Sequence, residues 1–200
     1  MALLVTVDPI GTAPMFAALT AAYPDHERRR VAVRGVAIAA GILLAFALVG
    51  EWLLGALGIQ LSAFRIAGGV LLLLLSVDMV MVRHSGLRTT TDKEEEESGQ
   101  RGDVSVFPLA IPLVAGPGAL TTVVLLMSAA GGDPGRAALV LGELVLVLAF
   151  TLACFLGAGR LMRLLGITGV NVVTRVSGLL LAALAVQFVI DGVLAVVRTA

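Results

Sequence analysis

The sequence predicts an all-α membrane protein with six transmembrane helices in two inverted three-helix repeats, with helices 1 and 4 broken at Pro/Gly motifs. Three observations predict this class. Hydrophobic residues form 58% of the 200-residue chain and charged residues 14%, with a mean hydropathy of +1.03, unlike a soluble domain. Apolar stretches of about 20 residues, enough to cross the hydrocarbon core of a bilayer, recur along the chain. Two of these stretches contain paired prolines and glycines at corresponding places.

Six apolar segments follow one another, separated by polar turns. They are expected to cover residues 2–23, 31–54, 62–82, 106–130, 137–158 and 172–197. The first three form one repeat, residues 1–83, and the last three form the other, residues 106–200. Residues 84–105 contain four consecutive glutamates, and such a charged, low-complexity stretch predicts a solvated cytoplasmic loop. Residues 159–171 are expected to form an amphipathic connector before the sixth segment.

Matching motifs relate the two halves of the chain. Pro9 and Pro14 correspond to Pro112 and Pro117 at an offset of 103 residues. Two further pairs of motifs match in the same order: Leu57-Gly58-Ile59 with Leu165-Gly166-Ile167, and Arg65-Ile66-Ala67-Gly68 with Arg175-Val176-Ser177-Gly178. Because three is an odd number of spans, the second repeat crosses the bilayer in the opposite direction. The halves are then expected to meet around a site near the midplane.

The two breaks form the candidate binding site. Proline removes a backbone N–H and clashes with the preceding turn, and irregular backbone inside a bilayer is tolerated only where protein or a wet cavity surrounds it. A helix that restarts presents N–H groups that suit a carboxylate, and a helix that stops presents carbonyls that suit an ammonium group or a cation. The alternative is that the prolines only kink packed helices. The candidate substrate-binding residues are Asp8, Pro9, Gly11, Thr12, Pro14, Pro112, Ala115, Gly116, Pro117 and Gly118.

Charged residues within the spans are further candidates, because burying them in lipid is unfavourable. Asp8 is expected to pair with a ligand ammonium group or to carry a coupling proton, or alternatively to cap the broken helix. Glu143 is expected to pair with an arginine or to face the cavity. His26 and His84 lie in polar loops without a metal-ligand partner at helical spacing, and no Walker loop occurs. We therefore expect neither a metal nor a cofactor, and no enzyme.

The distribution of Lys and Arg predicts the orientation of the chain. Eleven of the 14 such residues lie in or beside the loops that follow segments one, three and five. The positive-inside rule places these loops in the cytoplasm and therefore both termini outside. The formal net charge is zero, so no basic excess indicates nucleic acid. These features predict a multi-pass protein whose partner is the lipid bilayer and not nucleic acid.

Four motifs occur in order along nearly the whole chain: Pro9-Ile10-Gly11-Thr12-Ala13-Pro14, Phe64-Arg65-Ile66-Ala67-Gly68-Gly69, Phe107-Pro108-Leu109-Ala110-Ile111-Pro112 with Ala115-Gly116-Pro117-Gly118, and Val186-Gln187-Phe188-Val189-Ile190. Together they resemble the MarC family of bacterial and archaeal inner-membrane proteins. Members of this family are described as six-helix proteins, and some as transporters of small neutral amino acids. The chain departs from many members in two respects: Asp8 stands where they have Asn, and only seven residues precede it.

The resemblance implies a function and a location. The implied function is secondary transport, by uptake or export, of small neutral amino acids such as alanine or glycine, coupled to H⁺ or Na⁺. The small residues at the breaks favour such a ligand over a bulky one. The implied location is the cytoplasmic (inner) membrane. The alternative is a non-transporting scaffold or sensor protein of the same fold, which kept the broken helices without a substrate.

Overall fold

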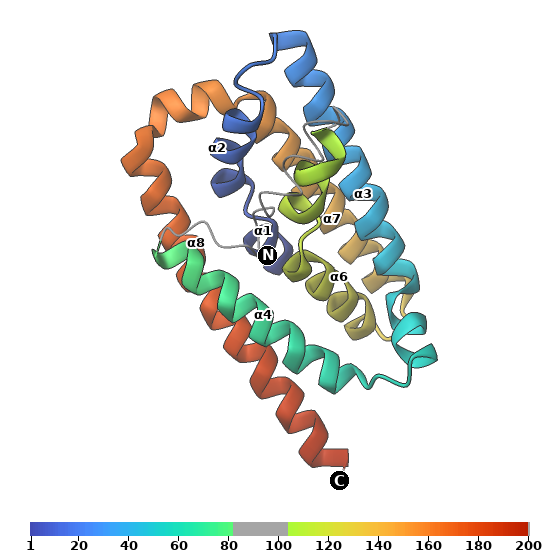
Figure 1. Cartoon of the computed structure of the whole chain (residues 1–200). Coiled ribbons are helices and arrows are strands. Elements are labelled where there is room, and N and C mark those ends of the chain that lie inside the picture. Colours follow the sequence, from blue (N-terminus) through green and yellow to red (C-terminus); the bar gives the residue numbers. More distant parts are fainter. Residues whose placement is uncertain (82–103, 200) are drawn as a thin grey trace.

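The structure, a computed structural model, describes residues 1–81 and 104–199, and every element in this part of the chain is a helix (Figure 1). The helices are α1 (Ala2–Val7), α2 (Pro9–Leu19), α3 (Asp25–Ala56), α4 (Leu61–Met81), η1 (Ser105–Val114), α6 (Pro117–Ala129), α7 (Pro134–Leu156) and α8 (Ala158–Thr199). The predicted all-α class is confirmed. The loop predicted for residues 84–105 lies, apart from its last two residues, outside the described part.

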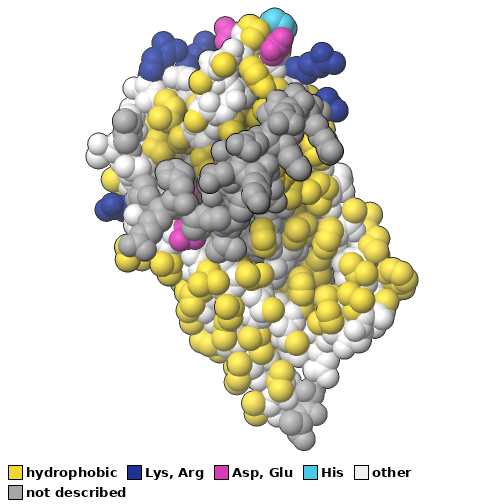
Figure 2. All heavy atoms as spheres, in the orientation of Figure 1, with side chains coloured by type: hydrophobic (Ala, Val, Ile, Leu, Met, Phe, Trp, Pro, Cys, Tyr) yellow, Lys and Arg dark blue, Asp and Glu magenta, His cyan; other side chains and the backbone are white. Residues whose placement is uncertain are grey.

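Several of the described helices are suited to cross a membrane. Five spans are long and apolar enough, one of them being α1 and α2 together, and the bent pair of η1 and α6 makes a sixth if it is counted as one span. Large apolar side chains such as Trp52, Leu146 and Leu179 are exposed on α3, α7 and α8, as lipid contact requires. Figure 2 shows apolar side chains over the lower part of one face, and Arg side chains gathered at the end where α3 begins. The chain is therefore an integral, multi-pass membrane protein.

Local sequence explains both ends of α3. Asp25 lies in the first turn, where its charge offsets the positive end of the helix dipole. The helix ends at a left-handed glycine, Gly58, with a φ of 69°. The N–H of Gly58 donates to the carbonyl of Gly55 at 3.0 Å, and the N–H of Ile59 donates to that of Leu54 at 2.9 Å. These two bonds satisfy the last carbonyls and turn the chain into α4.

The sixth span begins earlier than the sequence predicted. Helix α8 is interrupted at Gly166, whose φ of 61° and ψ of 178° are not helical. Residues 158–165 form the connector, and the spanning part runs from Thr168 to Arg198. The predicted connector, residues 159–171, is therefore helical on both sides of Gly166, and its last residues belong to the span. Glycine permits this bend because it has no Cβ to clash at positive φ.

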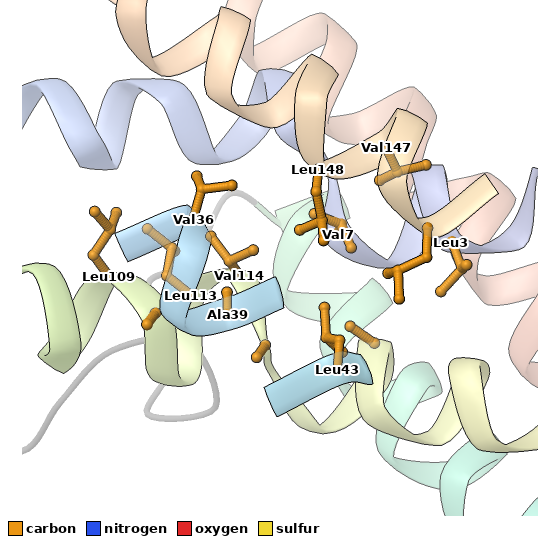
Figure 3. Packing of buried hydrophobic residues seen from close by; sticks show 14 of the residues in the cluster. Leu3, Val7, Val36, Ala39, Leu43, Leu109, Leu113, Val114, Val147 and Leu148 are labelled. Atoms are coloured by element: carbon orange, nitrogen blue, oxygen red, sulfur yellow. The ribbon is translucent and has the colours of Figure 1, made fainter. Parts of the chain in front are cut away.

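One large hydrophobic cluster, here called the main cluster, joins both halves of the chain. Figure 3 shows side chains of α1, α3, η1 and α7 meeting in it: Leu3, Val7, Val36, Ala39, Leu43, Leu109, Leu113, Val114, Val147 and Leu148. At one end of it Phe16 of α2 and Phe155 of α7 stack, with ring centroids 4.7 Å apart and an interplanar angle of 11°. The helices of the first half therefore have their core partners in the second half.

Helices α4 and α8 form a second cluster, the α4–α8 cluster, which contains Leu72, Leu75, Met79, Leu181 and Ala185. The two helices lie side by side along much of their length (Figure 1). Glycines allow this approach: a Cβ on Gly69 would lie 2.8 Å from the carbonyl oxygen of Ala185, and one on Gly192 would lie 3.0 Å from that of Ser62. These contacts make the pair antiparallel. Small residues at such interfaces are typical of membrane helices, which associate by close packing.

The close approach at Gly69 predicts a large effect of substitution. Gly69→Val should force α4 away from α8 and lower the stability of the protein by about 1–3 kcal/mol, as over-packing does in other cores. The measurement is the midpoint of thermal unfolding of the purified protein in detergent. Gly142→Val is the matched control, because a Cβ on Gly142 of α7 would have no neighbour within 4 Å. Equal midpoints for the two variants would contradict the described packing.

Candidate functional site

Asp8 both ends α1 and begins α2. Its backbone has a φ of 49° and a ψ of 65°, the left-handed conformation that Asp and Asn adopt more readily than other residues with a side chain. Its N–H donates to the carbonyl of Leu4 at 3.0 Å, and its carboxylate accepts a hydrogen bond from the N–H of Gly11 at 3.2 Å. The residue is only 3% exposed. One buried acidic residue therefore caps two half-helices.

The first helix is interrupted at Asp8, and not between Pro9 and Pro14 as the sequence predicted. Pro9 is the first residue of α2. A backbone N–H at this position would have no acceptor within the helix, so proline, which lacks the N–H, loses no hydrogen bond there. Pro14 lies inside α2, which continues through it to Leu19. The hydroxyl of buried Thr12 donates to the carbonyl of Asp8 at 2.9 Å and fastens this first turn.

Gly11 lies against the carboxylate of Asp8. A Cβ at Gly11 would clash with Oδ2 of Asp8. The absence of a side chain therefore leaves room for that carboxylate, and the predicted role of Gly11 in ligand binding stays a prediction. The start of α2, which the sequence analysis assigned to a ligand carboxylate, is capped by a carboxylate of the chain itself.

The second break is wider than the predicted stretch between Pro112 and Pro117. Within η1, Phe107 (φ −135°, ψ 125°) and Ile111 (φ −128°, ψ 129°) have extended backbone. Each of them precedes a proline, and the proline ring disfavours a helical conformation of the preceding residue. The N–H of Ala115 then donates five residues back, at 2.9 Å. Helix α6 leaves η1 at an angle of 58°.

Helix α6 begins without a side-chain cap. Its N-cap is Gly116, and Pro117 at the first position has no N–H. The first intrahelical bond of this turn runs from the N–H of Leu120 to the carbonyl of Gly116 at 3.0 Å. The N–H groups of Gly118 and Ala119 point out of the helix start, where no side chain of the described residues caps them. The two breaks therefore differ: the side chain of Asp8 caps the start of α2, whereas no side chain of the described residues caps the start of α6.

The two broken helices lie against each other. Helix α1 contacts α6, and α2 contacts η1. Because each half of one broken helix contacts the opposite half of the other, the two breaks lie at the same level of the bundle. Asp8, Pro9, Thr12, Ala115 and Gly118 are buried there, Gly11, Pro14, Pro112 and Gly116 are partly buried, and Pro117 is exposed.

The glycines of the second break are closely packed. A Cβ at Gly116 would lie 2.6 Å from the carbonyl oxygen of Pro112, and a Cβ at Gly118 would lie 2.6 Å from Cδ2 of Leu72 in α4. Side chains at these positions would therefore displace η1 or α4 as well as any ligand. Gly118 is also the point at which α6 meets the α4–α8 cluster.

Thr122 is a further residue of this site, which the sequence analysis did not single out. It is fully buried, and its hydroxyl has no hydrogen-bond partner among the described residues. Five other buried hydroxyls donate to a carbonyl of their own helix: Thr6, Thr12, Thr20, Ser76 and Thr151. Thr122 lies four residues after Gly118 and so on the same helix face, with its side chain tilted toward the break. The signal in the sequence is the polar pair Thr121-Thr122 inside an apolar run.

Two other residues complete the comparison with the sequence predictions. Glu143 of α7 forms an ion pair with the amino group of Met1, and not with an arginine. Cys154 is buried in the main cluster. Among the described residues, no group of three or more His, Cys, Asp or Glu side chains is placed to hold a metal ion.

Comparison with known proteins identifies the family. The family described as "MarC family integral membrane protein" matches residues 1–197. A UPF0056 membrane protein of Methanocaldococcus jannaschii is 42% identical over 94% of this chain and 90% of its own length. A UPF0056 membrane protein of Aquifex aeolicus is 34% identical over 96% of this chain and 89% of its own length. UPF0056 membrane protein YvbG of Bacillus subtilis is 33% identical over 94% of this chain and 89% of its own length. No solved structure matches. The resemblance seen in the motifs is thereby confirmed, and the chain belongs to the MarC family of integral membrane proteins.

Proposed function

We propose that this protein is a secondary transporter of small neutral amino acids such as alanine or glycine. The observation that carries the proposal is the uncapped start of α6 at the second break, beside the first break, which holds the buried carboxylate of Asp8. An uncapped helix start and a carboxylate at the same level are complementary to the two charges of a zwitterion.

The carboxylate of the substrate binds at the start of α6. The N–H groups of Gly118 and Ala119 supply hydrogen bonds, and the helix dipole adds a positive potential. The unpartnered hydroxyl of Thr122 lies one turn further along the same helix. Because Leu72 of α4 packs directly on Gly118, space at this point is limited and apolar, which suits a small side chain.

The ammonium group of the substrate binds at the first break. Burying a carboxylate in a membrane span costs free energy, and carboxylates found there commonly mark substrate or ion sites. Asp8 is such a buried carboxylate. The last carbonyls of α1 point toward the same break, because α1 ends at Val7. An ammonium group, or a coupling H⁺ or Na⁺, is the partner that these oxygen atoms favour.

An inverted repeat of helices 1–3 and 4–6 is part of the proposal. Asp8-Pro9 and Gly116-Pro117 are both an N-cap followed by proline, at an offset of 108 residues. Gly58 and Gly166 have the same offset, and both have positive φ. The pairing of α1 with α6 and of α2 with η1 is the pattern that such a two-fold relation requires. This offset replaces the 103 residues that the proline spacing suggested.

The transport function is tested with purified protein in liposomes. Labelled alanine should enter or exchange, with and without a gradient of H⁺ or Na⁺. Unlabelled alanine and glycine should compete, whereas alaninamide, which lacks the carboxylate, should compete at least about tenfold less well because it loses charge-assisted hydrogen bonds. A folded protein that moves none of these amino acids would favour a scaffold or sensor.

The role of Asp8 makes a separate prediction. Asp8→Asn keeps a good helix cap and the left-handed conformation, so the protein should fold and bind, but the pH dependence of transport should change. Asp8→Ala should abolish transport. The measurement is the initial uptake rate as a function of pH, between about pH 5 and pH 8.

A matched control separates charge from capping. Asp133 also caps its helix, α7, and is also followed by proline, but it is exposed and has extended backbone. Its carboxylate accepts from the N–H of Gly135, two residues on, at 2.8 Å. Asp133→Asn should leave transport and its pH dependence unchanged. An unchanged pH profile in Asp8→Asn as well would leave Asp8 with the role of a cap only.

The proposed location is the cytoplasmic membrane of a bacterium or archaeon, with both termini outside. A topological prediction tests it on two exposed residues at opposite ends of spans. On a Cys154→Ala background, Asp133→Cys should react rapidly with an impermeant maleimide in intact cells, and His26→Cys should react only after the cells are opened. The reverse pattern would invert the orientation that Lys and Arg predict.

A further inference from the structure

A cavity of about 530 Å³ lies where α3 and α8 begin. Phe16, near the end of α2, lines it, whereas the two breaks lie near the start of that helix. Four arginines line it, against one aspartate, Asp25. They are Arg28 and Arg29 of α3 and Arg160 and Arg163 of α8. The fold thus brings together arginines that are more than 130 residues apart in the sequence.

The guanidinium groups at this cavity keep donors for a ligand. Nη1 of Arg28 is 3.9 Å from Oδ1 of Asp25, whose side chain is 98% exposed, so this pair is weak and screened by solvent. Nε of Arg163 donates to the carbonyl of Gly159 at 3.2 Å, which holds the side chain along the first turn of α8. No ion pair or side-chain hydrogen bond of Arg29 or Arg160 is formed with the described residues. Four like charges with so little compensation favour the binding of an anion.

The apolar part of the cavity narrows the choice of anion. Its lining includes the stacked rings of Phe16 and Phe155, which are buried. Leu156, at the end of α7, also lines it and is 52% exposed, and Leu164, next to Arg163, is 84% exposed. Arginines beside exposed apolar residues at the end of spanning helices are placed where lipid headgroups lie. Figure 2 shows Arg side chains at this end of the molecule, with apolar side chains over the lower part of the same face.

We propose that this cavity binds a phosphate group, namely that of an anionic phospholipid headgroup. Guanidinium groups bind phosphate oxygens through paired, charge-assisted hydrogen bonds. Basic pockets between membrane helices take such headgroups, and the acyl chains would lie against the exposed leucines. The bound phosphate would bridge α3 to α8, and so join the two halves of the chain at this end.

The experiment measures the thermal midpoint of purified protein in a neutral detergent as a function of added phosphatidylglycerol, phosphatidylcholine or inorganic phosphate. Phosphatidylglycerol should raise the midpoint, and phosphatidylcholine should not. The double variant Arg28→Gln, Arg160→Gln should weaken the apparent affinity for phosphatidylglycerol at least about tenfold, because two charge-assisted bonds are lost. If the double variant is unstable without lipid, Arg160→Gln alone replaces it in the experiment, because Arg160 is exposed and its substitution leaves the core unchanged.

Arg136→Gln is the matched control. Arg136 lies near the start of α7, is 71% exposed and has Nε 3.5 Å from Oδ2 of Asp133. This variant should respond to phosphatidylglycerol as the wild type does. An increase in the midpoint with inorganic phosphate alone, lost in the Arg160→Gln variant, would support the phosphate site and assign it to a soluble source. An equal response to phosphatidylcholine, or an equal loss in the Arg136→Gln variant, would overturn the proposal.

Discussion

Inside a bilayer every backbone N–H and carbonyl must find a partner within the protein, and the irregular parts of this structure follow from that requirement. At the first break one residue, Asp8, satisfies both sides, with its N–H bonded to α1 and its carboxylate bonded to α2. The buried hydroxyls of Thr12, Ser76 and Thr151 return to carbonyls of their own helices. The start of α6 departs from this pattern, since its first N–H groups have no side-chain cap. That exception is the physical basis for placing a ligand there.

The sequence could predict the class of the fold and the regions of the breaks, because composition and paired prolines are signals carried by the residues themselves. It could not predict the position of the first break. A proline at the start of a helix and a proline within it look alike in a sequence. Pro9 is at the start of α2 and Pro14 is within it. The signal that distinguishes them is Asp8, since Asp before Pro is a helix cap and Asp tolerates a left-handed backbone. Asn, which the resemblance assigns to this position in many relatives, has both properties too.

Features that depend on pairs of distant residues were not accessible from the sequence. The close approach at Gly69, for example, is to the carbonyl of Ala185 in α8, far away in the sequence. Arginines of α3 and α8, counted above only for orientation, line one cavity because the fold brings the starts of these two helices to the same end of the bundle. Threonine in an apolar run normally donates to a carbonyl of its own helix, so the Thr121-Thr122 pair is only a weak signal in the sequence. The missing bond of the Thr122 hydroxyl becomes visible only in the structure.

The two hydrophobic clusters divide the molecule along a boundary that passes through the proposed site. Gly118, at the second break, meets Leu72 of the α4–α8 cluster, and Val5 of α1 packs against the same cluster just before the first break. Both breaks are otherwise embedded in the main cluster, through residues such as Val7 and Val114. A substrate at the breaks would therefore touch both clusters at once. Alternating access requires one packed unit to move against another around a fixed site, and in the proposed transport the two clusters on either side of this boundary would be those units.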